Sequence, residues 1–206
     1  ISDITVSAGD LTGTASFTPT NDSVYEINET AIVSISSVSG ADATESGTQS
    51  KTLTITADGD AAPTVTLASS ATSIAENAGS SLTLTATLSN ATNEDVTVGI
   101  STSGTGTEGT DYSTISDITI SAGQTTGTVS FTPTDDNTYE GNETGIVAIS
   151  TVSGGSATED GTQSVTITIT ENENAPTVTL ATSASSIAEN AGSSLTLTAT
   201  LSVATT

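Results

Sequence analysis

The chain has 206 residues, and its 24 acidic side chains are matched by a single basic one, which gives a formal charge of −23. This charge excludes nucleic acid as a partner and disfavours anionic membrane surfaces, because both are bound through basic side chains. The absence of Cys and His excludes disulfides, the usual zinc and haem sites and histidine-activated nucleophiles, but it leaves oxygen ligands for hard cations. We expect no enzymatic activity, and no apolar run is long enough for membrane insertion.

The elements follow one another in an internal repeat. The sequences of residues 1–5, 17–22 and 25–30 recur within residues 115–144, at an offset of 114. The sequence of residues 63–67 recurs at 176–180, at an offset of 113. We therefore divide the chain into the later part of one unit (1–61), a complete unit (62–175) and the opening part of a third unit (176–206). Either the chain is a window on a longer array, or its ends are completed by neighbours.

The complete unit alternates apolar residues with Thr and Ser at a period of two, as in Leu82, Leu84, Ala86 and Leu88. This period is typical of half-buried antiparallel strands. Seven strands are expected, near 63–69, 80–89, 95–101, 115–121, 126–133, 143–152 and 163–171. Seven short strands in one unit predict an all-β fold, an antiparallel immunoglobulin-like β-sandwich repeated in tandem. The expected core comprises Val65, Leu67, Ile74, Leu82, Leu84, Leu88, Val96, Val98, Ile118, Ile120, Val129, Phe131, Val147, Ile149, Val165, Ile167 and Ile169.

Three acidic clusters lie at strand ends, at 73–79, 134–143 and 170–176. A calcium ion takes six to eight oxygens and accepts them from separate loops. A single acidic residue in a loop is more often simply solvated, but Asp135, Asp136 and Glu140 together favour a cation site. The leading part-unit repeats their spacing with Asn21, Asp22 and Glu26.

Four stretches, 73–79, 106–112, 120–123 and 134–144, resemble the Calx-β domain, a module of the regulatory loop of sodium–calcium exchangers and of large microbial surface proteins. The last stretch, Thr-Asp-Asp-Asn-Thr-Tyr-Glu-Gly-Asn-Glu-Thr, is the most diagnostic of the four. The resemblance implies antiparallel sandwiches that bind Ca²⁺ at one tip, next to the following domain.

The resemblance also implies a set of ligands. In the complete unit they are Glu76, Asp135, Asp136, Glu140, Glu171 and Glu173. In the part-units they are Asp22, Glu26, Asp58, Asp60 and Glu189. Glu143 is left open, as a further ligand or as a cap of its strand. The exchanger's closing acidic triplet is Glu171-Asn172-Glu173 here, and Ser103 stands where the family sometimes has an acid, so we expect fewer ions than in the exchanger.

Three functions are compatible with this pattern. The first is a calcium-stabilised structural or adhesive segment of a large microbial cell-surface or secreted protein, which acts as a rigid spacer between neighbouring repeats of the same chain. The second is a subunit of an extracellular fibre, completed by strand exchange between identical chains. The third is a carbohydrate-binding or ice-binding module, suggested by the row Thr83, Thr85 and Thr87, although exposed aromatic residues for a sugar site are few.

Overall fold

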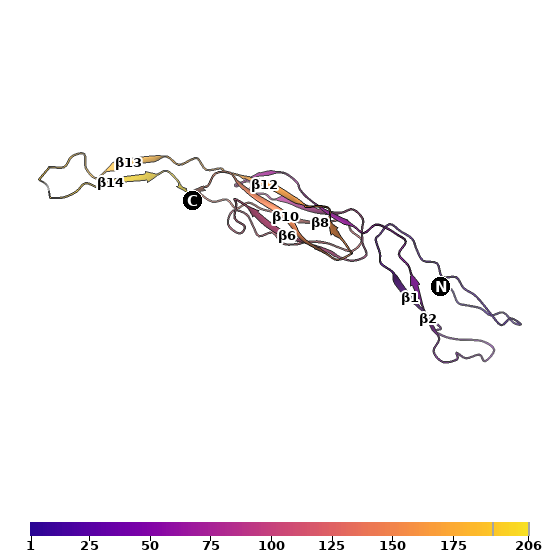
Figure 1. Ribbon diagram of the computed structural model, residues 1–206. Helices are drawn as coiled ribbons and strands as arrows, with labels where there is room; N and C mark the ends of the chain where they lie inside the picture. The colour runs from indigo at the N-terminus through magenta and orange to yellow at the C-terminus, as the bar shows by residue number, and fades with distance from the viewer. Residues whose placement is uncertain (191, 206) are drawn as a thin grey trace.

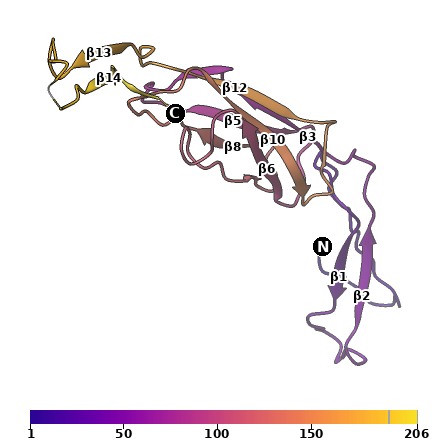
Figure 2. The same ribbon diagram turned by 60° about the vertical axis from the view of Figure 1, so that its left-hand side comes forward.

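The computed structural model describes residues 1–190 and 192–205, which form an elongated molecule of three parts (Figures 1 and 2). A β-sandwich occupies the middle. The hairpin of β1 (Glu29–Ser34) and β2 (Ser50–Ile55) lies toward the N-terminal end, and the hairpin of β13 (Val178–Thr182) and β14 (Leu197–Leu201) lies at the opposite end. The described residues include no helix long and apolar enough to cross a membrane.

The sandwich consists of two sheets, which confirms the all-β expectation. One sheet has the strand order β4-β12-β10-β6-β7 and the other has the order β11-β3-β5-β8. The strands are β3 (Thr64–Ser69), β4 (Ser73–Ala75), β5 (Leu82–Leu88), β6 (Val96–Gly104), β7 (Ile118–Ile120), β8 (Thr126–Phe131), β10 (Glu143–Ser153), β11 (Thr158–Glu159) and β12 (Ser164–Thr170). Each of the seven expected strands overlaps one of these. The additional strands β4 and β11 are short and run parallel to β12 and β3, respectively.

The core lies between the two sheets and contains all the expected residues, with Leu82, Val129 and Val165 only partly buried. The core also contains four buried residues that the expected list omitted: Ala86, Tyr112, Ile115 and Ala157. The ring of Tyr112 stacks on Phe131, with 4.7 Å between the ring centroids. A Cβ on Gly145 would lie 2.8 Å from the Phe131 ring, so a glycine on β10 makes room for this stack.

The flanking hairpins use the same strand register as their counterparts in the sandwich. β1 and β2 pair Glu29 with Ile55, just as β10 and β12 pair Glu143 with Ile169. β13 and β14 pair Val178 with Leu201, and β3 and β5 pair Val65 with Leu88. The flanks are hairpins and not sandwiches in this structure, so the division into tandem sandwich units at 1–61, 62–175 and 176–206 stays a prediction.

Candidate metal centre

Strand pairing brings two of the acidic segments to the same edge of the sandwich. β4 runs parallel to β12, with Ala75 opposite Thr170, so the next residues along the two strands are Glu76 and Glu171. The backbone N–H of Glu76 donates to the carbonyl oxygen of Thr170 at 3.0 Å, which extends the pairing to that residue. Glu76 is also one of the two buried polar residues in the sandwich, at 7% exposure. The two carboxylates therefore leave parallel strands side by side.

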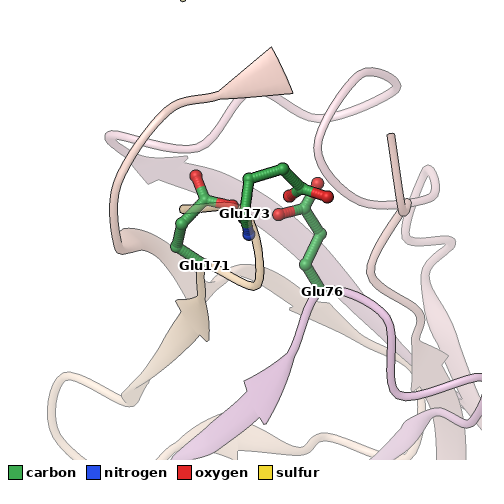
Figure 3. A group of neighbouring side chains, drawn as sticks. All are labelled: Glu76, Glu171 and Glu173. Atoms are coloured by element: carbon green, nitrogen blue, oxygen red, sulfur yellow. Dashed lines mark hydrogen bonds between the residues drawn. The ribbon is translucent and has the colours of Figure 1, made fainter. Parts of the chain in front are cut away.

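Three carboxylates meet at this edge. Oxygens of Glu76, Glu171 and Glu173 lie within 4.8 Å of one another. Figure 3 shows the carboxylates of Glu76 and Glu173 facing each other, while that of Glu171 lies beside the backbone of Glu173. Oε2 of Glu173 is buried and has no hydrogen-bond partner. A buried carboxylate oxygen without a donor is unfavourable unless a cation or water satisfies it.

Backbone N–H groups fix Glu171 in its charged form. Its Oε2 accepts hydrogen bonds from the N–H groups of Glu140 at 2.6 Å and Gly141 at 2.8 Å, and its Oε1 accepts from that of Glu173 at 2.9 Å. Desolvation alone would raise the pKa of Glu171, but these N–H donors outweigh it and lower the pKa to about 2. Glu171 therefore connects the 134–142 loop to the end of β12.

The other two carboxylates of the cluster are shifted in the opposite direction. Desolvation, followed by repulsion from Glu171 and Glu173, raises the pKa of Glu76 to about 7, against a hydrogen bond from the Asp136 N–H at 3.3 Å. The Glu171 carboxylate, which accepts a hydrogen bond only from the protonated form of Glu173, and then desolvation raise the pKa of Glu173. The only basic side chain, Lys51, lies on β2 in the leading part-unit. The charge of this cluster therefore has no basic side chain of the sandwich to balance it.

A second cluster adjoins the first. Carboxylate oxygens of Asp111, Glu140 and Glu143 lie within 4.8 Å of one another, and all three residues are half-buried. Desolvation, followed by repulsion from Asp111 and Glu140, raises the pKa of Glu143 to about 7. Desolvation, followed by repulsion from Asp111 and Asp136, also raises the pKa of Glu140. Glu140 links the clusters, because its carboxylate belongs to the second and its N–H donates to Glu171 in the first.

The structure brings together only part of the ligand set that the sequence indicated. Glu76, Glu171 and Glu173 share one cluster and Glu140 belongs to the other. The remaining indicated residues belong to neither three-carboxylate group among the described residues: Asp135, Asp136, Asp22, Glu26, Asp58, Asp60 and Glu189. Asp136 instead accepts a hydrogen bond from the Thr138 N–H at 2.6 Å, which shapes the loop.

Sequence reasoning did not select Asp111, and it left Glu143 open. Asp111 is in the 106–112 stretch that carried the family resemblance, which is the signal that could have identified it. The segment has no strand periodicity, so only the folded chain shows that Asp111 lies beside Glu140 and Glu143.

Acidic residues also lie close together in the leading part-unit, but the hydrogen bonds that hold their loop differ from those in the sandwich. Desolvation, followed by repulsion from Glu29 and Asp22, raises the pKa of Glu26. Asp60 has a buried Oδ2 without a hydrogen-bond partner. Asn142 Oδ1 accepts from the Glu171 N–H at 3.0 Å, and in the leading part-unit Asn28 Oδ1 accepts from the Ala57 N–H at 2.9 Å. Ala57 therefore stands at the position of Glu171, so the leading part-unit lacks the carboxylate that accepts hydrogen bonds from the loop backbone.

The donor chemistry of the complete tip fits calcium. Both clusters offer only carboxylate oxygens, drawn from separate segments of chain, which is the arrangement that Ca²⁺ prefers. The unpartnered Oε2 of Glu173 is the most direct structural indication, because a cation there would satisfy an oxygen that otherwise lacks a partner. A bound cation would also favour the charged forms of Glu76 and Glu143, whose pKa values are raised to about 7.

Comparisons with known proteins give the family. The family model described as the Calx-beta domain matches residues 58–173. Among solved structures, the crystal structure of the apo form of the Calx CBD1 domain is similar at 15% identity with a TM-score of 0.44, covering 54% of this chain and 98% of that one. The comparison with curated proteins finds no match. The family model spans more than half of the chain, including β3 to β12 and both carboxylate clusters, and the chain therefore belongs to the Calx-β domain family of calcium-binding β-sandwich modules.

Proposed function

We propose that the chain is a calcium-stiffened spacer segment of a large extracellular or cell-surface protein, with the neighbouring repeats of the same chain as its immediate partners. One observation carries this proposal. The carboxylate clusters lie at the end of the sandwich from which the chain leaves through Glu171 and Glu173 toward Pro176 and the next part-unit.

A cation at this position would act on the exit segment itself. Glu171 and Glu173 are part of that segment, whereas Glu76 follows β4 and Glu140 lies in the loop after β8. One ion bound to carboxylates from these segments would restrain the exit segment relative to the sandwich. Pro176 restricts the backbone of the exit further, because its ring fixes φ. A flexible connection would thereby become a stiff one.

Composition supports an extracellular location for such a spacer. The chain is rich in Thr and Ser and carries a charge of −23. Carboxylates at this density repel one another and destabilise a compact domain, unless cations screen or bind them. Calcium at millimolar concentration outside cells would provide this cation continuously. The tip would then hold calcium permanently, and the role of the ion would be structural.

The test is a comparison of the whole chain in calcium, in magnesium and in chelator. We expect calcium to raise the melting temperature by several degrees, because the ion binds only the folded tip. We also expect the distribution of molecular dimensions in small-angle X-ray scattering to narrow when calcium is added. The variant Glu173→Gln should lose most of both effects. Glu45→Gln should keep them, because Glu45 lies in the β1–β2 loop, remote from the tip, and a glutamine keeps the oxygen that accepts from the Gln49 N–H. Equal melting temperatures and dimensions in calcium and chelator would contradict the proposal.

A second candidate is a fibre subunit completed by strand exchange between identical chains. The flanking hairpins favour it, because they expose apolar residues whose counterparts are buried in the sandwich, such as Leu180 and Leu197. Sedimentation of the chain in calcium separates the two candidates. A concentration-dependent series of larger species supports strand exchange, and a single monomeric species supports the spacer.

A further inference from the structure

The same backbone pairing joins the sandwich to the part-unit on each side of it. Tyr25 of the leading part-unit pairs in parallel with Thr92, and its N–H donates to the carbonyl oxygen of Ala91 at 2.8 Å. At the opposite end, β15 (Ala204–Thr205) pairs in parallel with β9 (Thr138–Tyr139), which places Thr205 opposite Tyr139. The yellow end of the ribbon, up to residue 205, accordingly lies against the sandwich in both views (Figures 1 and 2).

The two pairings involve equivalent residues. Tyr25 and Tyr139 occupy the same place in the repeat, in the acidic motif, and the Ala-Thr pairs at 91–92 and 204–205 also correspond. In each case the tyrosine segment belongs to one unit and the Ala-Thr segment to the unit that follows. A contact formed by equivalent residues at both junctions indicates a built interface, because an accidental contact would have no reason to recur at the same offset.

The sandwich holds its own Ala-Thr edge rigidly. Thr92 is buried, at 1% exposure, and its carbonyl oxygen accepts a hydrogen bond from the Gly123 N–H at 2.8 Å. A Cβ on Gly155 would lie 2.5 Å from Cγ2 of Thr92, so only glycine leaves room for the threonine in this position. The edge that receives the preceding unit is therefore preformed.

The first junction adds two side-chain contacts to the pairing. Asn90 Nδ2 donates to the carbonyl oxygen of Ala61 at 2.9 Å, across the connection between the units. Asn93 Nδ2 lies 3.5 Å from Oε1 of Glu29, at the start of β1. Together with the bridge at Thr92, these contacts attach residues 90–93 to the preceding part-unit at three places.

We propose that this pairing is the docking interface between successive repeats, in which the tyrosine segment of one unit's acidic loop binds the Ala-Thr edge of the next unit. The coupling of this docking to calcium binding rests on the proposed function. Tyr139 lies between Asp136 and Glu140, and Glu171 holds the backbone of the same loop at Glu140 and Gly141. An ion that orders this loop orders the docking strand as well, and by linkage a docked neighbour strengthens ion binding.

The test measures how firmly the first junction is held in the whole chain. The sequence has no Cys, so Thr54→Cys on β2 and Thr126→Cys on β8, both exposed, give a single pair of spin labels across the junction. In Gly155→Ala the added methyl group lies within the sandwich and displaces Thr92, which disturbs the Ala-Thr edge. Gly161→Ala is the matched control, because Gly161 also has a positive φ, +67° against +53°, but has open space around its Cβ position.

A second pair of variants acts from the other side of the junction. Tyr25→Pro removes the N–H that donates to Ala91 and lies outside the sandwich, so it leaves the folding of the sandwich intact. Tyr25→Phe is its control, because it keeps both the N–H and the ring. The readout at the first junction is the width of the distance distribution between the labels in calcium. A second label pair, Thr126→Cys with Thr198→Cys on β14, both exposed, reads the second junction in calcium and in chelator, because the loop there is the one that Glu171 holds.

We expect a narrow distribution in calcium for the parent, Gly161→Ala and Tyr25→Phe, and a distribution about twofold broader for Gly155→Ala and Tyr25→Pro, since undocked domains move independently. Distributions as narrow in these two variants as in their controls would overturn the docking interface. If the two variants broaden the first-junction distribution but the second-junction distribution stays narrow in chelator, the interface stands, and its dependence on calcium fails together with the proposed function.

Discussion

The same sequence is buried in one part of this molecule and exposed in another. Leu67 on β3 is 7% exposed, whereas its counterpart Leu180 on β13 is 72% exposed. Phe131 on β8 is fully buried, and its counterpart Phe17 is 40% exposed. The strand register around Leu67 and Leu180 is nevertheless the same in the sandwich and in the flank.

This difference separates two levels of structure. Hairpin register follows from local alternation and turn residues, so it forms wherever the sequence occurs. Burial requires the second sheet, which the flanking hairpins lack. An isolated two-stranded hairpin is at best marginally stable in water, so the free energy of unfolding should reside almost entirely in the sandwich. Equivalent substitutions in the two regions test this directly.

The largest expected difference is between two equivalent leucines. Leu84→Ala on β5 should lower the free energy of unfolding by about 2–5 kcal/mol, because it leaves a cavity in the core. Leu197→Ala on β14 should change it by less than about 0.5 kcal/mol, because that side chain is already largely exposed. Urea unfolding followed by circular dichroism measures both. A similar loss in the two variants would mean that the trailing hairpin is covered in solution.

A second difference concerns the room for the aromatic stack. Gly145→Ala on β10 should cost about 1–3 kcal/mol, because its Cβ would lie 2.8 Å from the ring of Phe131. The leading part-unit already has Ala31 at the equivalent position, where Phe17 is not packed into a core. Ala31→Gly should therefore leave the unfolding of the sandwich within about 0.5 kcal/mol of the parent.

A double-mutant cycle makes this second prediction specific. If the cost of Gly145→Ala arises from the ring, adding Phe131→Leu should recover part of it, and the two substitutions should be non-additive. Strictly additive losses would show that the alanine destabilises β10 for a reason unrelated to Phe131.

A third difference appears as a pH dependence in chelator. The pKa values of Glu76 and Glu143 in the folded state are raised from an ordinary 4.5 to about 7, so between these values the folded protein binds more protons than the unfolded chain. Stability should thus be fully present below about pH 4.5 and fall as pH rises through 7. Glu171, whose pKa is lowered to about 2, acts in the opposite sense and only at lower pH.

Unfolding measured from pH 5 to pH 8 checks this slope. The double variant Glu76→Gln with Glu143→Gln should flatten it, and so should saturating calcium, because the ion favours the charged carboxylates. Glu26→Gln is the control from the leading part-unit: the pKa of Glu26 is raised as well, but the residue lies outside the sandwich, so the slope should persist. Stability that rises from pH 5 to pH 8 in chelator would contradict the assigned directions.

Sequence periodicity predicted the seven main strands and nearly all of the core, because six of these strands have six or more residues and alternate several times, and the three residues of β7 lie in a longer alternating stretch. The short strands β4, β9 and β11 have two or three residues and so carry no detectable period. Tyr112 and Ile115 escaped the core prediction for the related reason that the segment before β7 is irregular, although it packs inside.

The candidate site was predictable in its chemistry but not in its grouping. Strand ends rich in Glu and Asp indicated an oxygen site, and the parallel pairing of β4 with β12 brought Glu76 to Glu171. That pairing joins residues almost a hundred positions apart, which no local pattern reveals. The second cluster depends in the same way on how the irregular segment folds, which is why Asp111 was not selected.

The smallest predicted effect comes from two equivalent asparagines. Asn142 holds the N–H of Glu171, and Asn28 holds the N–H of Ala57, in each case through its side-chain oxygen. Each exposed hydrogen bond should contribute only about 0.5–1.5 kcal/mol. Asn142→Ala should nevertheless weaken calcium binding several-fold in a titration, because it releases the segment that positions the Glu171 carboxylate. Asn28→Ala should leave calcium affinity unchanged, since Ala57 has no carboxylate to position. Equal effects of the two substitutions would show that the complete tip does not bind the ion through Glu171.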